Sequence, residues 1–420
     1  MWEASEPVRA FSPSDVHLVG IGGDGMLAIA HYLADMGCQC SGSDLRSTSE
    51  IALLAARGVR IFDGHAPAHV AGARQLVVSD AIRASNPELA EARLRDLPIS
   101  GRAAFLQQLA REKQAVFVAG SHGKSTTTAM IATVLESAGL LPSFILGADA
   151  ACLGDRRSRF QPGEIFVAEA CEAFGNLAPL LPDFAVITNI DDDHLEHYGS
   201  QAALDRAFAD FVARTRRGAV VNGDDPGVRR IDACGPDILT FGFGEANRVR
   251  ASGFAQDVGG STFDVSFEGR SARVRLSIPG RHTACNALAC AALCLRLNID
   301  LEIIAAGLAT FTGVARRWTD HASVGGIRIV DDYAHHPTEL NVSIETALAL
   351  RVPGQRLIIA HQPQLVSRTR RLTAEIAAAL ARCDAALLLD LDPGGEKEEP
   401  EVTSEAIAAS VDAAGGRAIF

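Results

Sequence analysis

Short apolar runs alternate with amphipathic segments along most of the chain. Runs of strand type occur at residues 16–19, 75–78, 115–119, 165–168, 184–187 and 218–221. Helical spacing of apolar residues follows several of them, for example over residues 26–36. Alternation of this kind is typical of α/β folds, in which helices join parallel strands. We therefore predict an α/β protein built on parallel sheets.

Two later regions change this pattern. Short alternating strands between residues 236 and 280, at 262–267 and 272–278, predict a small antiparallel insertion. A helical, alanine-rich stretch follows, and then a further α/β unit. Its expected strands are 327–330, 356–360 and 385–389, and residues 417–420 look like the beginning of another strand. With 420 residues, the chain is long enough for about three domains.

The most informative stretch begins at the apolar run 115–119. Gly120 and Gly123 flank a tight turn, Lys124 and Ser125 follow, and an apolar-periodic segment then begins a helix. Strand, glycine turn, Lys-Ser and helix together are typical of a phosphate-binding loop. Its backbone N–H groups and helix N-terminus meet anionic oxygens, the lysine neutralises them, and the hydroxyl reaches Mg²⁺.

Two observations bear on this phosphate loop. The strict pattern G-x-x-x-x-G-K-[ST] is not met, because Val118 stands where its first glycine belongs. An ordinary strand-to-helix turn is therefore the alternative. Lysine is scarce, with only Lys113, Lys124 and Lys397 in the chain. A lysine kept in a background of arginine indicates a need for a compact ammonium head.

A second glycine-rich turn follows the first apolar run. Gly20, Gly22 and Gly25 precede a helical segment, and Asp44 stands about 20 residues farther on. This spacing fits the dinucleotide-fold fingerprint of tight turn, close phosphate approach and ribose contact. A close-packed turn without a ligand is the alternative. Asp24 fits poorly, since a carboxylate in a diphosphate loop repels its ligand.

Polar groups follow two buried-type strands of the second unit. Glu169 and Glu172 close the run that starts at residue 165, and residues 191–194, Asp-Asp-Asp-His, follow the run 184–187. Parallel α/β sheets bind their ligands at the carboxyl ends of the strands, so these metal-capable groups are expected at the site. A solvated loop is the alternative for residues 191–194.

Composition argues against several classes of function. The chain has 51 acidic and 39 basic side chains, and its formal net charge of −12 argues against a general binder of nucleic acid or membrane surfaces. No apolar run approaches ~18 residues, so we expect no membrane span. The first seven residues, Met-Trp-Glu-Ala-Ser-Glu-Pro, lack the basic and apolar regions of a signal peptide.

The nine cysteines are scattered and form no C-x-x-C pair. Cys38 and Cys40 are two residues apart on an expected strand, and Cys290 and Cys294 are four apart on an expected helix. Core packing is the better interpretation of both pairs. A reducing cytoplasm is the expected compartment.

Seven motifs, taken together and in order, resemble those of the Mur ligase family of ATP-dependent amide-forming enzymes. They are residues 20–26 (Gly-Ile-Gly-Gly-Asp-Gly-Met), 120–128 (Gly-Ser-His-Gly-Lys-Ser-Thr-Thr-Thr), 169–172 (Glu-Ala-Cys-Glu), 188–194 (Thr-Asn-Ile-Asp-Asp-Asp-His), 279–282 (Pro-Gly-Arg-His), 331–339 (Asp-Asp-Tyr-Ala-His-His-Pro-Thr-Glu) and 367–370 (Ser-Arg-Thr-Arg). The resemblance spans residues 16 to 404 and is greatest to the branch that adds L-alanine to UDP-N-acetylmuramate. The branch that recycles cell-wall tripeptide is a near relative.

The resemblance implies three domains. Residues 1–108 would form a Rossmann-like domain for the UDP-sugar, and residues 109–315 a central P-loop domain for ATP with the antiparallel insertion. Residues 316–420 would form a Rossmann-like domain that binds the amino acid and closes over the site; by the family's pattern it is several tens of residues short. We expect a cytoplasmic monomer or homodimer.

The family's reaction implies roles for the phosphate-loop side chains. A substrate carboxylate attacks the γ-phosphate of ATP to give an acyl phosphate, and an amine then displaces phosphate. Such chemistry needs charge neutralisation and in-line positioning. Cofactor contacts are implied for Gly120, His122, Gly123, Lys124, Ser125, Thr126, Asn189, Asn286, Arg317 and Asp332, and Mg²⁺ ligands are Ser125, Glu169 and His194. A solvated loop histidine is the alternative for His122.

Two substrate pockets are implied as well. The UDP end would contact Gly20, Gly22, Gly25, Asp44 and Ser79. The amino acid would meet Tyr333, His336, Arg368 and Arg370, with an arginine pairing with its carboxylate. Lys124, Glu169, His194, His336 and Arg368 would be the catalytic group. A capped helix start before Pro337 is the alternative for His335 and His336.

Departures from the family's pattern fall mainly in these pockets. Asp24 replaces a small residue, Asp80 a serine, Thr283 an asparagine, Gln364 a histidine and Val366 an aromatic residue. Residues 390–396 are acidic where the family has an aromatic residue and usually an arginine.

Three functions stay open at this point. The first is addition of L-alanine to UDP-N-acetylmuramate, and the second is the same chemistry on another amine or carboxylate, such as tripeptide recycling. The third is a degenerate nucleotide-binding relative without turnover. Intact Lys124, Glu169 and His194 favour an enzyme, whereas Asp24 and Asp80 favour the third function.

Overall fold

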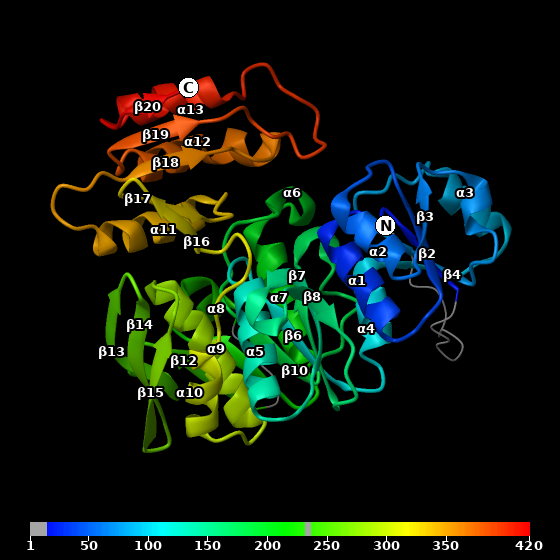
Figure 1. Ribbon diagram of the computed structural model, residues 1–420, viewed down its shortest axis with the longest axis horizontal. Coiled ribbons are helices and arrows are strands. Elements are labelled where there is room, and N and C mark those ends of the chain that lie inside the picture. Colours follow the sequence, from blue (N-terminus) through cyan, green and yellow to red (C-terminus); the bar gives the residue numbers. More distant parts are fainter. Residues whose placement is uncertain (1–14, 232–236) are drawn as a thin grey trace.

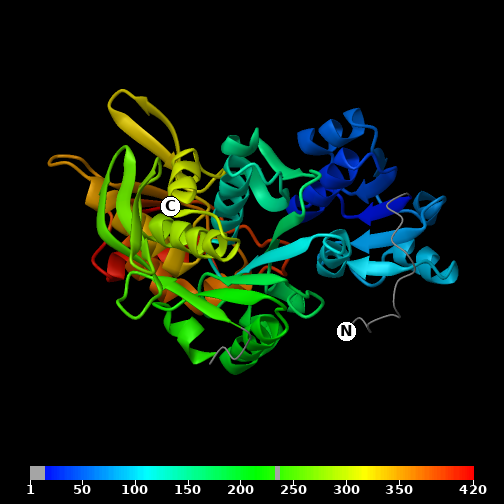
Figure 2. The ribbon, with the colours of Figure 1, turned by 90° about the horizontal axis from the view of Figure 1, so that it is seen from below.

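The computed structural model describes residues 15–231 and 237–420, which form three regions in chain order (Figure 1). Figures 1 and 2 both show the N-terminal region at one end of the molecule, beside the central region. The first seven residues, on which the expectation of no signal peptide rests, lie outside the described ranges. Within those ranges no helix is both long and apolar enough to cross a membrane.

The N-terminal region is a five-stranded parallel sheet in the order β3-β2-β1-β4-β5. Its elements are β1 (Val16–Val19), α1 (Asp24–Asp35), β2 (Cys40–Asp44), α2 (Ser49–Ala56), β3 (Arg60–Asp63), η1 (Pro67–Val70), β4 (Gln75–Val78), α3 (Pro87–Leu94), β5 (Ile99–Gly101) and α4 (Arg102–Leu109). The strand order reverses between β1 and β4, which is where such sheets bind ligands.

Strand β2 begins later than predicted. We expected it near residues 38–41, but it runs from Cys40 to Asp44. The reason lies in the end of α1, because the Cys38 N–H donates to the carbonyl of Leu33 at 3.0 Å and closes the helix. Cys38 therefore lies outside the strand, and Asp44 is the last strand residue.

The central region is a ten-stranded sheet in the order β15-β14-β13-β12-β11-β10-β6-β9-β7-β8. Its strands are β6 (Gln114–Ala119), β7 (Ser143–Ala150), β8 (Arg156–Arg159), β9 (Ile165–Ala170), β10 (Phe184–Ile187), β11 (Gly218–Asn222), β12 (Ile238–Gly242), β13 (Val249–Asp257), β14 (Gly260–Phe267) and β15 (Arg270–Leu276). Its helices are α5 (Lys124–Ser137), η2 (Ala151–Leu153), η3 (Ala173–Gly175), α6 (Leu195–Tyr198), α7 (Gln201–Ala213), α8 (Pro226–Arg230), α9 (Arg281–Arg296) and α10 (Leu301–Ala309). Strands β13–β15 pair antiparallel, which confirms the predicted insertion.

The C-terminal region combines a hairpin with a small sheet. Its elements are β16 (Thr319–Val324), β17 (Ile327–Asp331), α11 (Pro337–Leu350), β18 (Ile358–His361), α12 (Val366–Leu380), β19 (Ala385–Leu388), α13 (Ser404–Ala413) and β20 (Ala418–Ile419). Strands β18, β19 and β20 are parallel, and β20 confirms the strand expected at the chain end. The strand predicted at 327–330 is β17, but it pairs with β16 in an antiparallel hairpin outside that sheet.

Both faces of the central sheet are buried. In β6, Val116 and Val118 point into the core that contains α5 and α9, whereas Phe117 and Ala119 point into a second core. A strand with two covered faces has no polar side, which explains its continuous apolar run. In α9 the Sγ atoms of fully buried Cys290 and Cys294 are 4.0 Å apart, which confirms core packing for this pair.

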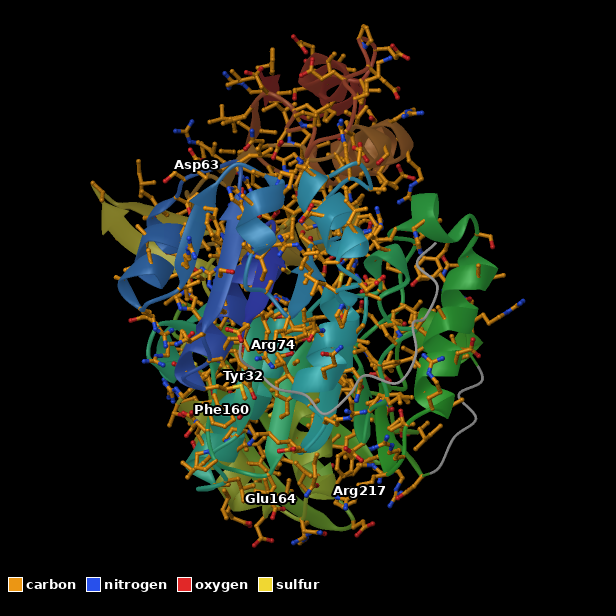
Figure 3. All side chains as sticks on the ribbon, turned by 90° about the vertical axis from the view of Figure 1, so that its right-hand side faces the viewer. Tyr32, Asp63, Arg74, Phe160, Glu164 and Arg217 are labelled. Atoms are coloured by element: carbon orange, nitrogen blue, oxygen red, sulfur yellow. The ribbon has the colours of Figure 1, made fainter. Side chains whose placement is uncertain are left out.

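The second core joins the N-terminal and central regions. Tyr32 of α1 has its ring centroid 5.7 Å from those of Phe160 and Phe166, both in edge-on contact. Figure 3 shows Tyr32 and Phe160 at this junction. The same buried cluster runs from Val16 to Ile231. The C-terminal region has a separate core around Ile344, Ile376 and Ile407.

Asp24, which fits poorly in a diphosphate loop, has ionic partners at this junction. Arg157, whose side chain is 9% exposed, lies 3.2 Å from Asp24, 2.6 Å from Asp149 and 3.4 Å from Glu50. Arg316 lies 3.7 Å from Asp24 on the other side. As the first residue of α1, Asp24 also meets the positive end of the helix dipole. Its charge thus has a structural explanation.

We predict that Arg157→Met destabilises the protein by ~1–2 kcal/mol, because three carboxylates lose a nearly buried cation. Urea unfolding measures the change. Arg248→Met is the matched control, since Arg248 and Glu268 form a pair in which both side chains are more than half exposed. We expect the control to shift stability by less than ~0.5 kcal/mol. Equal shifts in the two variants would contradict the structural role of Arg157.

Candidate active site

A cavity of about 1270 Å³ lies where the three regions meet. The central region contributes residues of the phosphate loop and of the strand ends, including Lys124, Glu169 and His194. The C-terminal region contributes side chains around Tyr333, and the N-terminal region contributes residues at Asp80. Predicted site residues that lie hundreds of positions apart are therefore brought to one space.

The phosphate loop needs both of its glycines. Gly120 has φ +138° and Gly123 has φ +81°, values that favour glycine. A Cβ at Gly120 would lie 2.1 Å from Thr188 Oγ1, and one at Gly123 would lie 2.5 Å from Asn286 Oδ1. No side chain caps α5 at Gly123, so the first N–H groups of this helix can serve an anion.

Asn189 holds the loop from the end of β10. Its side chain accepts the His122 N–H at 2.8 Å and donates to the His122 carbonyl at 2.9 Å. Thr188 Oγ1 donates to the same carbonyl at 2.7 Å. Asn189 thus fixes the loop backbone, which is a different contact from the nucleotide contact predicted for it.

Lys124 is paired with a buried carboxylate. Its Nζ lies 2.9 Å and 3.2 Å from the two oxygens of Glu172, and it also donates to the carbonyls of Gly120 and Ser121. Burial lowers the pKa of Lys124 because it disfavours the charged amine. The attraction of the Glu172 carboxylate outweighs this effect and holds the pKa of Lys124 above its ordinary value. Lys124 is therefore a fixed cation on the cavity wall.

Ser125 and Glu169 place two oxygen donors side by side on the cavity wall. Ser125 Oγ donates to Glu169 Oε2 at 3.0 Å, and the Gly147 N–H donates to Glu169 Oε1. A Cβ at Gly147 would lie 3.2 Å from both carboxylate oxygens, so glycine allows this approach. Hydroxyl and carboxylate oxygens are the hard donors that Mg²⁺ prefers, and these two residues fit that ion.

His194 also lines the cavity. It is the N-cap residue of α6, and its backbone is left-handed, with φ +59°. Its Nε2 is 3.7 Å from Asp193 Oδ2 and 4.0 Å from Glu172 Oε1. An imidazole between carboxylates can take a cation in place of a proton. The structure thus brings all three predicted metal ligands to the cavity.

Three consecutive acids after β10 dock the C-terminal region. Thr338 Oγ1 donates to Asp191 at 2.5 Å, Arg371 pairs with Asp192 at 2.8 Å and Arg368 pairs with Asp193 at 3.1 Å. The last pair is almost fully buried. Burial raises the pKa of Asp193, but His194 and Arg368 outweigh it and the pKa lies below its usual range. Residues 191–194 are therefore an interface and not the solvated loop considered as an alternative.

His122 links the phosphate loop to that interface. Its Nε2 lies 3.1 Å from Asp191 Oδ2 and its Nδ1 lies 3.3 Å from Glu339 Oε1. Burial lowers the pKa of His122, but these two carboxylates raise it to about 9. His122 is thus a cation between two regions, and the alternative of a loop histidine in water is wrong.

The described residues include one group of three metal-capable side chains whose ligand atoms all lie within 4.8 Å, and it is His122, Asp191 and His336. Three of the four imidazole nitrogens make hydrogen bonds, and the fourth, His336 Nε2, lies 3.6 Å from Asp192 Oδ1. His122 bonds two carboxylates, and His336 Nδ1 accepts the Thr338 N–H at 3.3 Å. We therefore interpret this group as a docking contact.

The residues predicted for the nucleoside, Asn286, Arg317 and Asp332, also line the cavity, as does Thr126 of the phosphate loop. Arg317 lies 3.4 Å from Glu339, and its guanidinium stands 5.3 Å from the ring centroid of Tyr333. Ser343 Oγ donates to Asp332, whose pKa burial raises. These groups share one wall with the phosphate loop.

Two residues predicted for the amino-acid pocket have other positions. His336 is 2% exposed, stands outside the cavity wall and caps α11, so the structure matches the capped helix start considered as its alternative. His335 lines the cavity in its place. Arg370 pairs with Glu399 at 2.6 Å on the exposed face of α12, away from the cavity. Both Arg368 and Tyr333 do line the cavity.

The residues predicted for the UDP end gather at the carboxyl ends of β1, β2 and β4. Asp44 Oδ2 accepts the Gly22 N–H at 2.8 Å, and a Cβ at Gly20 would lie 3.0 Å from Ser79 Cβ. Gly20, Gly22, Gly25, Asp44 and Ser79 lie outside the cavity lining, which reaches this edge only at Asp80 and Ala81. Asp44 thus braces the glycine turn.

Several functional side chains had no role in the sequence interpretation. Glu172 was noticed only as a strand-end carboxylate, although its position just beyond the strand that carries Glu169 could have suggested a partner for Lys124. Arg102 was not noticed. Its Nε lies 3.9 Å from Asp80 Oδ2, and its side chain packs so closely on Gly25 that a Cβ there would lie 3.0 Å from Arg102 Cδ. This arginine offsets the carboxylate of Asp80 beside the glycine turn. Nothing local in the sequence indicates that contact.

Comparison with known proteins gives three matches to family models along the chain. Residues 15–114 match the Mur ligase family catalytic domain, residues 118–294 the Mur ligase middle domain, and residues 316–420 the Mur ligase glutamate ligase domain. A UDP-N-acetylmuramate–L-alanine ligase of Xanthomonas campestris pv. campestris (strain B100) is 40% identical over 423 residues, which cover 98% of this chain and 88% of the relative.

Solved structures show the same likeness. A UDP-N-acetylmuramate-alanine ligase from Thermotoga maritima superposes with a TM-score of 0.81 at 28% identity, covering 97% of this chain and 90% of that one. A murein peptide ligase from Psychrobacter arcticus has a TM-score of 0.71 at 22% identity, covering 96% and 89%, and supports the fold alone.

The docking contact of His122 predicts a pH dependence. The pKa of His122 is raised from an ordinary 6.5 to about 9, so its stabilisation is complete below pH 6.5 and is lost as pH rises through about 9. We expect His122→Gln to cost ~2 kcal/mol more at pH 6.5 than at pH 9.5 in urea unfolding. His197→Gln, an exposed histidine, is the control. Parallel pH profiles for wild type and His122→Gln would show that the contact is not proton-linked.

Proposed function

The chain belongs to the Mur ligase family, and on that premise we propose that it joins L-alanine to the carboxylate of UDP-N-acetylmuramate at the expense of ATP. The observation that carries the choice of substrates is the 40% identity to UDP-N-acetylmuramate–L-alanine ligases along 98% of the chain. The arrangement of Lys124, Ser125 and Glu169 on one cavity wall supports the phosphoryl chemistry. We place this work in the cytoplasm, in peptidoglycan precursor synthesis.

We assign the nucleotide to the phosphate loop. The N–H groups at the start of α5 and the Lys124 ammonium would hold the β- and γ-phosphates. Ser125 would hold one Mg²⁺, and Glu169 and His194 would hold a second; when bound, the ions would neutralise charge on the attacking and leaving oxygens. Glu172 keeps Lys124 charged and aimed into the cavity, where it would neutralise the phosphoryl oxygens as the carboxylate attacks.

The incoming amino acid would bind beside Arg368. One guanidinium nitrogen of this arginine is bound to Asp193, but its buried Nε has no hydrogen-bond partner among the residues that the structure describes. A buried donor without a partner favours an acceptor in the cavity, and an amino-acid carboxylate supplies one. Tyr333 and His335 line the same part of the wall. We accordingly propose His335 as the histidine of this pocket.

The three regions support a division of labour. We propose domains at residues 1–108 for the UDP-sugar, 109–315 for ATP and 316–420 for the amino acid and closure. In this arrangement the sugar nucleotide lies along the switch point of the N-terminal sheet. Its carboxylate then enters the cavity past Asp80, where Arg102 and Asn176 hold that side chain.

Phosphate release from ATP and Mg²⁺ tests this function. We expect release with UDP-N-acetylmuramate that depends on L-alanine, with little release for other amino acids or for L-alanyl-D-glutamyl-diaminopimelate tripeptide. Mass spectrometry of the UDP-linked product confirms the amide bond. Release that needs the tripeptide would replace L-alanine as the substrate. Nucleotide binding without turnover for any pair would exclude a ligase.

Lys124 can be tested with its charge partner removed. Lys124→Ala alone leaves Glu172 buried and unpaired, so loss of activity could reflect misfolding. The double variant Lys124→Met, Glu172→Gln is neutral at both positions and should keep the fold. We expect it to lose turnover by roughly 10²–10³-fold. Lys113→Met, which removes a lysine outside the cavity, is the control. Wild-type rates in the double variant would refute the phosphate site.

A further inference from the structure

Phe174 is an exposed aromatic side chain on the cavity wall. Its side chain is 62% exposed and lines the cavity. Among the residues that the structure describes, Phe174 and Tyr333 are the large apolar or aromatic side chains that line this cavity and are more than one-third exposed. Arginines already lie over the Tyr333 ring, 4.6 and 5.3 Å from its centroid. Within residues 15–231 and 237–420, no arginine or lysine lies over the Phe174 ring.

The backbone at Phe174 is strained. Its φ of +57° and ψ of +22° are left-handed, a conformation that is unusual for a bulky side chain. The Phe174 ring approaches the exposed imidazole of His197 edge-on, with 6.2 Å between the ring centroids. Burial of the ring therefore does little to offset the strain. A strained residue that gains little from folding contacts suggests a gain from a ligand.

Its neighbours in the chain place Phe174 within the site. Two residues before it, Glu172 holds the phosphate-loop lysine at 2.9 Å. Two residues after it, Asn176 donates to Asp80 Oδ2 of the N-terminal region at 2.9 Å. Phe174 therefore stands between the phosphoryl site and the wall of the sugar-nucleotide domain. A substrate that reaches from one to the other must pass its ring.

We propose that the Phe174 ring stacks on the apolar face of the substrate's sugar ring and so acts as a specificity-determining residue. The inference rests on the proposed function. In a UDP-muramoyl substrate the reacting carboxylate is attached to the sugar, so the sugar ring must lie near Lys124 while the UDP remains on the N-terminal sheet. The C–H face of a pyranose is an apolar surface, and an aromatic ring is its complement. Uridine diphosphate alone would not reach Phe174.

Calorimetric titration of the full chain with two ligands tests the assignment. We expect Phe174→Ala to weaken binding of UDP-N-acetylmuramate by roughly tenfold and to leave binding of UDP unchanged. Phe174→Tyr should keep wild-type affinity for both ligands, because the ring is kept. Leu94→Ala, at a residue 81% exposed on the N-terminal region, is the control for loss of an exposed apolar side chain and should change neither affinity.

A second variant separates stacking from folding. Asparagine tolerates left-handed backbone, so Phe174→Asn should unfold at the same temperature as wild type or higher. Its affinity for UDP-N-acetylmuramate should nevertheless fall by the same roughly tenfold as that of Phe174→Ala. In turnover, KM for UDP-N-acetylmuramate should rise while KM for ATP stays constant. If Phe174→Ala weakened binding of UDP and of UDP-N-acetylmuramate equally, or weakened neither, the stacking role of Phe174 would be overturned while the proposed function would stand. A wild-type chain that binds UDP but not UDP-N-acetylmuramate would overturn the proposed substrate as well.

Discussion

Three neighbouring carboxylates at the end of β10 set the condition on which the site depends. Asp191, Asp192 and Asp193 repel one another, so each requires a positive or hydrogen-bonding partner. The C-terminal region supplies all three partners from α11 and α12, and His122 brings the phosphate loop into the same contact. Charge compensation therefore draws the C-terminal region toward the phosphate loop. The cavity between them is a result of that compensation.

The Lys124–Glu172 pair applies the same rule inside the central region. A buried carboxylate is costly by itself, and a phosphate-binding lysine must not lose its proton. The ion pair between Lys124 and Glu172 neutralises the buried carboxylate, keeps the lysine protonated and fixes its position. At the junction with the N-terminal region the buried partner is instead the cation, Arg157, which Asp24 and two other carboxylates neutralise. Charges that look misplaced along the sequence thus serve as links between regions.

Much of this architecture could be predicted from the sequence because it depends on local patterns. The glycines at 120 and 123 need positive φ, the run before them needs two buried faces, and both requirements are visible in adjacent residues. Contacts between distant segments leave no such signal. The docking of Arg368 on Asp193, the placement of His335 instead of His336 on the cavity wall, and the brace between Asp44 and Gly22 depend on how regions pack. The family resemblance supplied the list of side chains, but three-dimensional packing decides which atoms they face.

The way the cores are divided has a consequence for motion. Tyr32, Phe160 and Phe166 belong to a single apolar core that the N-terminal and central regions share, so these regions should unfold in one cooperative step. The C-terminal region has its own core, and it meets the rest through ion pairs and through an apolar contact of Trp318, Val330, Ala347 and Leu350 with the central core. When exposed ion pairs separate, water hydrates both ions at little cost, and the buried Arg368–Asp193 pair costs more to open. A shared core cannot be opened without exposing apolar surface to water. Displacement of residues 316–420 would therefore expose less apolar surface than separation of the N-terminal and central regions.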